Sequence, residues 1–410
     1  MRFFGLICLL FFCLSVDAQL AYRPFPQHLH YTKGVINPDK FPQSKLDQTV
    51  ESFYNQWKSH YIKSISHKQE SYIWFEDKEE KQDKEDKQCV SEGQGYGMVI
   101  VALMAGFDPS AKNTFNNLYR YYHEHPSNRG RHLMAWAQNT HDKDIDETSA
   151  SDGDMDIAYS LLLANAQWGS TGPINYLQEA KSTIADIMRY DINRKTWSVL
   201  LSNGIEADSR DYFDTRSSDF MPANFKAFEQ VTGDTRWKNV IDNEYKLFAY
   251  MQKQYSPDAG LVPDFIIRLN KKAKPAPAHY LESVYDGDYN YNACRVPWRI
   301  ATDYLLSGDQ RSKAFVQKIN HWIRETTSNS TYNLSAGYTL AGDDIKDSHF
   351  EALSFIAPFA VSAMVDKSNQ QWLNSVWDYT VQFKLKDFDY YDNTVKMLDM
   401  LIVSGNYWKP

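Results

Sequence analysis

The sequence predicts an all-α protein in which twelve helices form six helical hairpins around one closed ring. The first observation is that helical periodicity recurs along almost the whole chain, interrupted by short clusters of Gly, Pro, Asn and Asp. The second is that no sequence repeat of fixed period is visible, which disfavours an open solenoid. The third is that residues 98–103, 157–163 and 350–359 are far more apolar than the other helical stretches. Such helices fit the inner wall of a ring, where a helix is buried on nearly all sides.

The first predicted helix follows Ser44, which with Asp47 looks like a capping box. Its apolar stripe contains Leu46, Val50, Phe53, Tyr54, Trp57, Tyr61 and Ile62. Residues 66–88 are strongly charged and read as a solvated hairpin or loop. Short strand-like pieces occur only near residues 261–267. The other eleven helices are expected at 93–106, 111–125, 154–168, 173–190, 218–232, 235–254, 292–306, 310–326, 348–365, 369–384 and 390–404.

The amino terminus has the pattern of a secretory signal peptide. Arg2 precedes an apolar stretch over residues 3–14, and Val16 and Ala18 suit cleavage after residue 18. Residues 19–43 are Pro-rich and aperiodic, so we expect an extended arm on the protein body. No later stretch is apolar for the ~18 residues of a membrane span. We therefore expect a secreted protein, with residues 19–410 as a single domain and without membrane association after cleavage.

The composition excludes some partners and favours others. The formal net charge is −8 and no basic stripe is visible, so nucleic acid is not an expected partner. Aromatic residues make up 15% of the chain, with 27 Tyr and 11 Trp. Tyr and Trp offer flat apolar faces with a polar tip, which suit sugar rings. An aromatic-rich core explains the same excess equally well. We expect a monomer.

Two of the four cysteines, Cys8 and Cys13, belong to the predicted signal peptide. The other two, Cys89 and Cys294, do not make a disulfide framework. Either one bridge between them or two free thiols would suit a secreted protein. No spacing typical of a metal site is present, and we expect neither a metal nor another cofactor.

The stretch 90–103 places Glu92 among Gly93, Gly95 and Gly97, just before an apolar run. Glycine removes side-chain bulk, so a large ligand could approach the backbone here. We expect a loop tied to the core, in which Glu92 is partly desolvated. Desolvation raises a carboxyl pKa, as a general acid near neutral pH requires. A glycine-rich helix start with a surface Glu is the alternative.

The stretch 148–164 places Asp152, Asp154 and Asp156 before an apolar helix. At least one should lie at the helix amino terminus, where free N–H groups stabilise an anion. For two of the three we expect a capping role or a position facing solvent. The remaining Asp, beside a Gly, could accept a sugar hydroxyl.

The stretch 279–303 combines four tyrosines and a Trp with Glu282, Asp286, Asp288, Arg295 and Arg299. So many acids and aromatics in a connecting segment favour a functional loop. A packed surface loop with internal ion pairs is the alternative. Two or three carboxylates beside aromatic residues suit glycoside hydrolysis, in which one acid protonates the leaving oxygen and a second carboxylate attacks or activates water. The sequence offers no Ser-His-Asp arrangement, P-loop or dinucleotide fingerprint as a rival.

Several motifs resemble glycoside hydrolase family 8. They are SEGQGYGM at 91–98, SASDGDMDIAYSLLLA at 149–164, YNYNACRVPWR at 289–299, SGNYWKP at 404–410, GVINP at 34–38 and the short FPQ at 25–27. The resemblance implies an (α/α)6 barrel and an endo-acting, inverting enzyme on β-1,4-linked polysaccharide or oligosaccharide.

Carried over position by position, the resemblance makes Glu92 the general acid and Asp152 the residue that binds and distorts the sugar beside the scissile bond. Asn292 departs from the pattern, because many members have an Asp there as the base. In the subgroup with Asn, a Glu of the preceding loop is the base, and Glu282 matches it. Asp286 and Asp288 remain rivals for that role on the same loop.

Five further residues are expected to bind substrate, namely Tyr96, Trp136, Tyr291, Asn292 and Arg295. The Asn-bearing subgroup resembles chitosanases and lichenan-degrading glucanases. Chitosan is the first expectation for the substrate, because a polycation is drawn to an acidic groove. A lichenase- or cellulase-like β-glucanase is the alternative within the class. A sugar-binding protein without catalysis, or a polysaccharide lyase, would be a different class.

Overall fold

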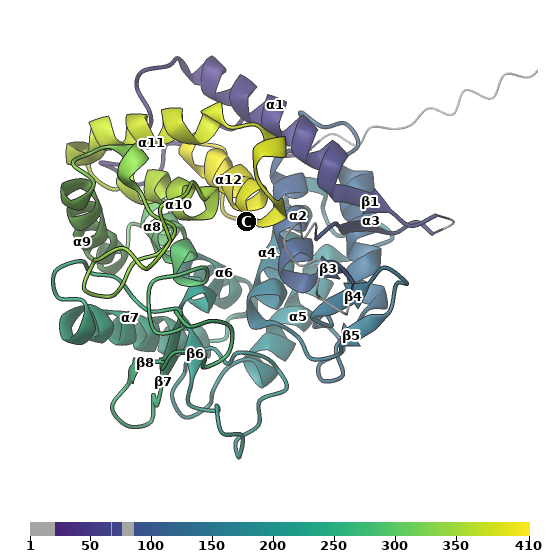
Figure 1. Ribbon diagram of the computed structural model, residues 1–410. Helices are drawn as coiled ribbons and strands as arrows, with labels where there is room; N and C mark the ends of the chain where they lie inside the picture. The colour runs from purple at the N-terminus through teal and green to yellow at the C-terminus, as the bar shows by residue number, and fades with distance from the viewer. Residues whose placement is uncertain (1–20, 67, 76–85) are drawn as a thin grey trace, which may run out of the picture.

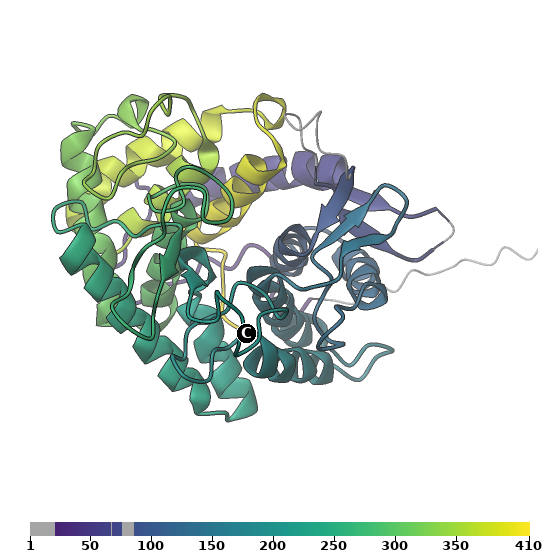
Figure 2. The ribbon, with the colours of Figure 1, turned by 60° about the horizontal axis from the view of Figure 1, so that its bottom comes forward.

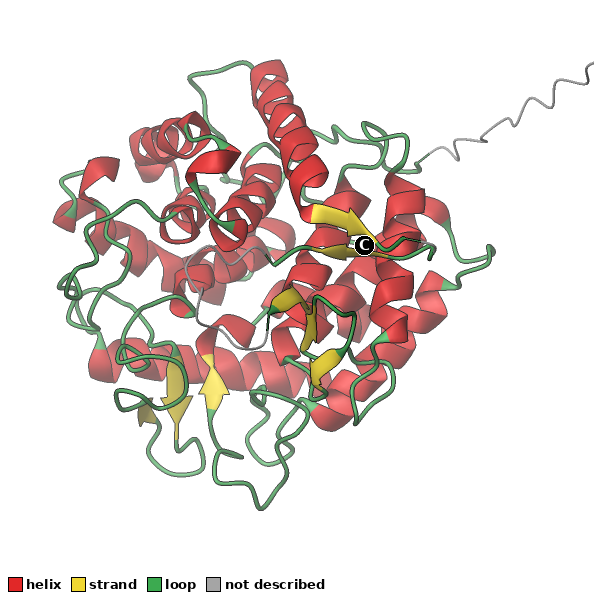
Figure 3. Cartoon of the chain, turned by 45° about the vertical axis from the view of Figure 1, so that its right-hand side comes forward, coloured by secondary structure: helices red, strands yellow, loops and turns green. Residues whose placement is uncertain are grey.

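The computed structural model describes residues 21–66, 68–75 and 86–410. The predicted signal peptide lies outside these residues, as do residues 76–85 of the charged run. All twelve predicted helices are present in the described part of the chain (Figures 1 and 3). They are α1 Gln43–Tyr61, α2 Ser91–Leu103, α3 Ala111–Glu124, α4 Ser151–Trp168, α5 Tyr176–Tyr190, α6 Pro222–Thr232, α7 Arg236–Tyr255, α8 Val296–Ser307, α9 Gln310–Thr326, α10 Leu353–Ala363, α11 Gln370–Gln382 and α12 Tyr390–Val403.

The helices form two concentric layers. The even-numbered helices make an inner ring, in which α2 packs on α4, α4 on α6, α6 on α8, α8 on α10, α10 on α12 and α12 again on α2. Each odd-numbered helix from α3 to α11 packs outside the even-numbered helix before it, and α1 packs outside α12. Figure 1 shows α1 lying beside α12, so the first and last helices are neighbours. The predicted closed ring of six hairpins is confirmed.

The inner helices are buried on nearly every side, as their apolar sequences require. All residues of α2 except Glu92 are buried, and so are all residues of α10. The prediction was wrong at the start of α10, because the helix begins at Leu353 and Phe350 is exposed outside it. An outer helix such as α3 buries only one stripe, which contains Phe115, Leu118 and Tyr122.

The Pro-rich segment is an arm that crosses the carboxyl-terminal ends of inner helices. The Tyr22 N–H donates to the Gln167 carbonyl in α4, and Phe25 donates to Ala105 just after α2. Further along, Leu29 donates to Gly405, Thr32 to Leu305 and Ile36 to Met364. The arm therefore closes one end of the barrel, against the ends of α2, α4, α8, α10 and α12.

At the opposite end, loops and three small antiparallel sheets surround the amino termini of the inner helices (Figures 2 and 3). Their strands are more numerous than predicted, because pairs of loop segments meet edge to edge there. They are β1 Ile62–Ser64, β2 Ser71–Ile73, β3 Lys87–Val90, β4 Ala137–Asn139, β5 Asp144–Asp146, β6 Thr215–Arg216, β7 Phe265–Ile267 and β8 Lys274–Pro275. Only β7 falls where a strand was predicted.

The capping box predicted at Ser44 is absent. The helix α1 begins one residue earlier, with Pro42 at its N-cap and no side-chain cap. Asp47 is used elsewhere, since it accepts hydrogen bonds from Gln43 and Asn406 and faces the ring of His28. It fastens the arm and the carboxyl-terminal tail to α1. Within the described residues, none of the helices combines the length and the apolar character needed to cross a membrane.

Candidate active site

The amino termini of the inner helices meet around Arg295, the last residue of a short 3-10 helix, Ala293–Arg295, that leads into α8. Its guanidinium is buried. The nitrogen Nη1 donates to Glu92 at 2.8 Å, Asp152 at 2.9 Å and the Tyr96 hydroxyl at 3.1 Å. The nitrogen Nη2 donates to Ser218 at 2.8 Å and to the Asn292 side-chain oxygen at 2.9 Å. One arginine therefore joins the three stretches that carry the candidate acids, 90–103, 148–164 and 279–303.

Glu92 lies in the first turn of α2, not in a loop as predicted. The strand β3 ends at Val90, and the helix starts at Ser91 with extended backbone at its N-cap. The Glu92 side chain retains 17% of its exposure, so it reaches the surface of the site. Burial raises the pKa of Glu92 to about 7, with Arg295 opposing this and Asp152 adding to it. The side chain can thus hold a proton near neutral pH.

The glycines around Glu92 make room for protein, not for a ligand as predicted. A Cβ on Gly93 would lie 2.3 Å from the Tyr390 hydroxyl, and one on Gly97 would lie 2.2 Å from the Ile73 side chain. A Cβ on Gly95 would lie 3.0 Å from the carbonyl oxygen of Gly153 in α4. The helix α2 is therefore enclosed by close neighbours, which fixes the direction of Glu92.

All three aspartates at the start of α4 are buried, which corrects the expectation that two of them face solvent or cap the helix. Asp154 accepts from the Met134 N–H, and burial raises its pKa well above the usual value. Asp156 is held by Arg299 and Asn224 beneath the site. Burial would raise the pKa of Asp152 as well, but Arg295, Arg216 and the Gly153 N–H outweigh it and lower that pKa. Only Asp152 faces Arg295.

Glu282 lies on the other side of Arg295 from Glu92, linked to it through Asn292. The Asn292 amide nitrogen donates to Glu282 at 2.7 Å, and its oxygen accepts from Arg295. Arg216 of β6 donates to the second Glu282 oxygen at 2.9 Å. The Glu282 side chain is 44% exposed, so solvent and ligands reach it. The side-chain N–H group of Asn292 thus positions Glu282, while its side-chain oxygen is already bound to Arg295.

Asp286 is not free to act on a ligand. Its carboxylate is buried and accepts the backbone N–H groups of Leu281, Glu282 and Ser283 at 2.6, 3.0 and 2.8 Å. This turn anchors the Glu282 loop. Leu281, the apolar residue next to Glu282, is exposed and does not anchor the loop. The rival Asp288 is half-buried, and burial raises its pKa.

Three residues near the network lie outside the predicted set. Asp264 is buried and accepts from the Asn290 and Ala293 N–H groups, at 2.9 and 2.7 Å, so it fixes the segment that carries Asn292 and Arg295. Burial raises the pKa of Asp264 to about 7. The other two are Ser218, which accepts from Arg295, and Arg216, which donates to Glu282. These residues lie in stretches without a motif. Only their charge could have marked Asp264 and Arg216, and nothing in the sequence marks Ser218.

The three predicted aromatic residues differ in position. Tyr96 is buried against Trp298, and its hydroxyl accepts from Arg295. Trp136 is half-buried, and its carbonyl accepts from the Ser91 N–H beside Glu92. Tyr291 is exposed next to Asn292 and packs edge-on against Phe355. Tyr291 is therefore the exposed ring of the three, whereas the Lys87 amine lies over the Trp136 ring, 5.0 Å from its centre.

The possible Cys89–Cys294 bridge is absent, and both thiols are free and buried. The Cys89 sulfur faces Gln94 in α2, whereas the Cys294 sulfur faces the Tyr291 carbonyl and the Tyr391 hydroxyl. The two sulfurs therefore have different neighbours. The described residues contain no group of His, Cys, Asp and Glu side chains arranged to hold a metal ion.

Acidic side chains with opposite pKa shifts surround one arginine at the open end of an (α/α)6 barrel. This arrangement is typical of a glycoside hydrolase. The chain matches the family model for glycosyl hydrolases family 8 over residues 43–405. It belongs to that family.

Three relatives illustrate the similarity. A β-glucanase of Niallia circulans is 42% identical over 408 residues, which cover 98% of this chain and 96% of the relative. An endoglucanase of a Bacillus species is 37% identical over 95% of this chain and 82% of its own length. The apo structure of a β-1,3-1,4-glucanase from Paenibacillus has a TM-score of 0.89 at 43% identity, covering 95% of this chain and all of that one.

Proposed function

We propose that this protein is a secreted, monomeric, endo-acting β-glucanase that hydrolyses its substrate with inversion, residues 19–410 forming one catalytic domain. Glu92 is the general acid and Glu282 is the general base. The observation that carries the proposal is the chain of contacts from Glu92 through Arg295 and Asn292 to Glu282. It holds two carboxyl groups at fixed positions with two side chains between them. Inversion needs such a gap, because a water must fit between the base and the sugar.

The role of Glu92 is supported by its protonation. With its pKa raised to about 7 by burial, the carboxyl is protonated at mildly acidic pH. It can therefore donate a proton to the glycosidic oxygen as the bond breaks. Its partly exposed oxygen lies at the amino terminus of α2, so the proton faces the open end of the barrel.

The role of Glu282 is supported by its contacts. Arg216 and Asn292 each donate to one of its oxygens, and both contacts stabilise the charged form that a base requires. Asp286 is bound to three backbone N–H groups and has no comparable access. Glu282 is the carboxylate on this loop that can polarise a water.

The remaining roles follow from position. Asp152, charged and beside Glu92, can accept hydrogen bonds from sugar hydroxyls on the same side of the scissile bond. Arg295 and Asn292 orient the two catalytic groups, and Tyr96 supports Arg295 from below. Trp136 and Tyr291 offer the aromatic faces on which sugar rings can stack.

The substrate favoured by the comparisons is β-glucan, and chitosan, the first expectation, is not favoured. The relatives are a β-glucanase, an endoglucanase and a β-1,3-1,4-glucanase. The electrostatic argument for a polycation also weakens, because Arg295 and Arg216 lie among the acids and offset their charge. A neutral chain of β-linked glucose fits this balance better.

A substrate panel tests the proposal. Barley β-glucan, lichenan, carboxymethylcellulose, chitosan and xylan are incubated with the enzyme, and new reducing ends are measured. We expect the highest rate on a β-glucan and a rapid fall in viscosity, which marks internal cleavage. Proton NMR of the first product should show the α-anomer, since one displacement at a β-linkage inverts it.

Other outcomes identify the alternatives. Hydrolysis of chitosan alone would restore the first expectation for the substrate. Binding without any cleavage would indicate a sugar-binding protein, and a product with a new C=C bond would indicate a lyase. A β-anomer as first product would contradict inversion and the role of Glu282 as a base.

A further inference from the structure

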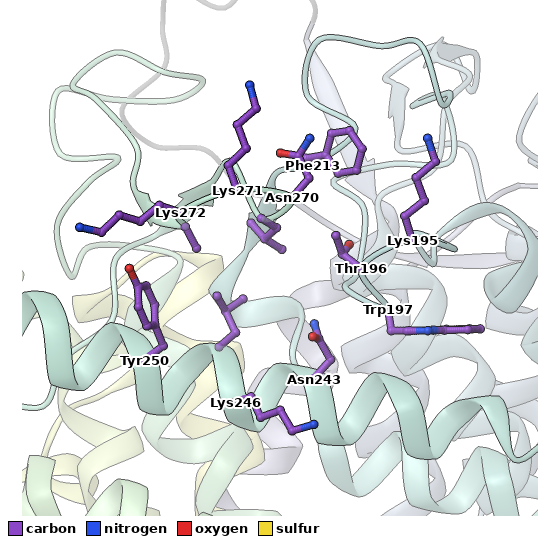
Figure 4. Close-up of a pocket in the computed structure, with 13 residues that line it drawn as sticks. Lys195, Thr196, Trp197, Phe213, Asn243, Lys246, Tyr250, Asn270, Lys271 and Lys272 are labelled. Carbon is purple, nitrogen blue, oxygen red and sulfur yellow. The ribbon is translucent and has the colours of Figure 1, made fainter.

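A second cleft lies outside the ring, between the helix α7, the segment 195–197 and the loop 269–273 (Figure 4). Its volume is about 730 Å³, within the range of about 300–1,000 Å³ typical of ligand sites. Phe213 and Leu269 join it to the β6–β7 sheet, since the Leu269 N–H donates to the Phe213 carbonyl. None of its lining residues belongs to the Arg295 network.

The cleft is strongly basic although the protein is acidic. Lys195, Lys246, Lys271 and Lys272 line it, and no acidic side chain does. Figure 4 shows these lysines on three sides of the opening. Among the described residues, no carboxylate lies within ion-pair distance of any of the four. On α7, Asp242 lies one turn before Lys246 and is paired with Arg311, and Glu244 is buried against Val199.

The floor and walls between the lysines are aromatic and polar. Trp197, Phe213 and Tyr250 are each half-buried and present one part of their rings to the cleft. The Lys195 amine lies 5.6 Å from the Phe213 ring centre, over its face. Asn243 and Asn270 add amide groups that both donate and accept. Flat rings with amides are suited to pyranose sugars, and lysines are suited to carboxylates.

The geometry points to a second binding site in this cleft, for a polysaccharide whose sugars carry carboxylate groups. The rings would stack on the sugars and the lysines would pair with the carboxylates. At ordinary ionic strength the screening length is about 8 Å, so the four local lysines outweigh the distant negative charge of the molecule. Such a site would hold the enzyme on an acidic polysaccharide while the barrel acts on another chain.

Two other ligand classes fit less well. A compact anion such as phosphate would need cations that converge on one point, whereas these lysines come from three separate segments. Nucleic acid binding favours an extended basic surface, and the net charge of −8 opposes a long polyanion beyond the cleft. A uronic acid chain has one charge per sugar and needs only a short basic stretch.

The test measures binding of hexagalacturonate, a carboxylate-bearing oligosaccharide, by calorimetry at low salt. Maltohexaose is the neutral probe of equal length. The test variant combines Lys195→Gln, Lys271→Gln and Lys272→Gln. The matched control combines Lys33→Gln, Lys45→Gln and Lys181→Gln, three exposed lysines outside the cleft with the same change in charge.

We expect the wild type and the control to bind hexagalacturonate equally, and the cleft variant to bind at least about 10-fold more weakly. Binding should vanish in about 1 M salt, where the screening length falls to about 3 Å. Cleavage of soluble β-glucan should be the same in all three proteins, which separates this site from the catalytic one. Tyr250→Ala should weaken binding without changing its dependence on salt.

Several results would overturn the proposal. No binding by the wild type, or equal weakening in the control, would exclude the site. Equal binding of maltohexaose would remove the requirement for carboxylates. Tighter, lysine-dependent binding of inorganic phosphate or of a single-stranded oligonucleotide would assign the cleft to those ligands instead.

Discussion

Glu92 and Asp152 accept hydrogen bonds from the same nitrogen of Arg295, yet their pKa values move in opposite directions. Burial dominates at Glu92 and raises its pKa to about 7. At Asp152, Arg295 and Arg216 outweigh burial and the Gly153 N–H adds to them. The negative charge of Asp152 in turn makes ionisation of Glu92 less favourable. One carboxyl is thereby set to give a proton and its neighbour to stay charged.

This coupling gives a prediction for the pH dependence of kcat/KM. The wild type should lose activity as pH rises through about 7, because Glu92 loses its proton. Asp152→Asn removes a neighbouring negative charge, so the pKa of Glu92 falls. The alkaline limb of the pH profile then moves to lower pH, whatever the variant loses in maximal rate. The exposed Asp258→Asn is the control and should leave the limb unchanged. An unchanged limb in Asp152→Asn would mean that the two groups are not coupled.

The identity of the base can be tested by chemical rescue. Glu92→Gln and Glu282→Gln should each reduce kcat by about 10²–10⁴-fold, while binding of oligosaccharide persists. Removing the whole side chain in Glu282→Ala leaves space for azide, which should restore turnover and yield an α-glycosyl azide. Asp286→Ala should also lose activity, because its turn comes apart, but azide should not restore it. Rescue of Asp286→Ala and not of Glu282→Ala would reassign the base.

The sequence indicated the residues that meet in the candidate site better than it indicated their surroundings. Glu92, Asp152, Asn292 and Arg295 lie in motifs specific enough to place them together. The role of Asp286 depends on which N–H groups its loop turns toward it, and no pattern of residue types encodes that. Arg216 and Asp264 approach the site through pairing of β6 with β7 and through a buried turn. Contacts of that kind arise from tertiary structure alone.

At the scale of elements, the contact between α2 and α4 determines how Glu92 and Asp152 face each other. The two helices approach through Gly95 and Gly153, without side chains between their backbones. A Cβ on Gly153 would lie 2.6 Å from the Ser91 hydroxyl and 2.8 Å from the Glu92 nitrogen. The helix starts can move apart only by moving the two carboxylates as well.

Gly153→Ala should therefore reduce both stability and activity. Overpacking of this kind costs about 1–3 kcal/mol, against the small gain that Ala usually brings to a helix. Urea unfolding and kcat on β-glucan measure the two effects. Gly172→Ala is the matched control, since a Cβ there meets no atom within 4 Å. Equal behaviour of the two variants would show that the helix contact tolerates a methyl group.

The helices were predicted well because their apolar spacing is strong and because turn residues separate them. Their starts were less accurate at the open end. There, α6 and α8 are preceded by short 3-10 turns over Ser217–Asp219 and Ala293–Arg295. The residues of these turns have helical character in sequence but bend to bring Ser218 and Arg295 into the site. The departure from regular helix thus lies where the site is built.

At the scale of the whole molecule, several acids are buried without an ion pair to any of the described residues. Burial raises the pKa of Glu244 to about 8 and those of Asp264 and Asp392 to about 7. In the unfolded chain such groups titrate near pH 4, so the folded state binds more protons between these values. Their contribution to stability is complete below about pH 4 and is lost as pH rises through about 7 to 8.

The free energy of unfolding should consequently fall as pH rises from about 5 to about 9. Glu244→Gln keeps an acceptor for the Val199 N–H but cannot ionise, so it should lessen the fall by up to a few kcal/mol. Urea midpoints across this pH range measure the effect. Glu124→Gln, at an exposed position, should follow the wild type. A Glu244→Gln variant with an unchanged slope would show that Glu244 is already ionised in the folded protein.

The closure of the ring was predictable from the number of helices and the apolar character of the inner ones. The second cleft was not, because Lys195, Lys246 and Lys271 are far apart in sequence and each looks like an ordinary surface residue. Only the folded chain places them on one opening (Figure 4).

The joining of the two ends of the ring also constrains the order in which the protein can fold. The helix α12 lies between α10 and α2, and Asn406 accepts the Gln27 N–H across 379 positions of sequence. A chain emerging from the ribosome therefore has a gap in its inner wall until α12 has been made. Contacts so distant in sequence form slowly, and the apolar faces of α2 and α10 stay open to other chains meanwhile. We expect nascent chains that stop before residue 390 to bind chaperones and to be cut by proteases. Resistance to digestion should appear in one step once α12 is complete.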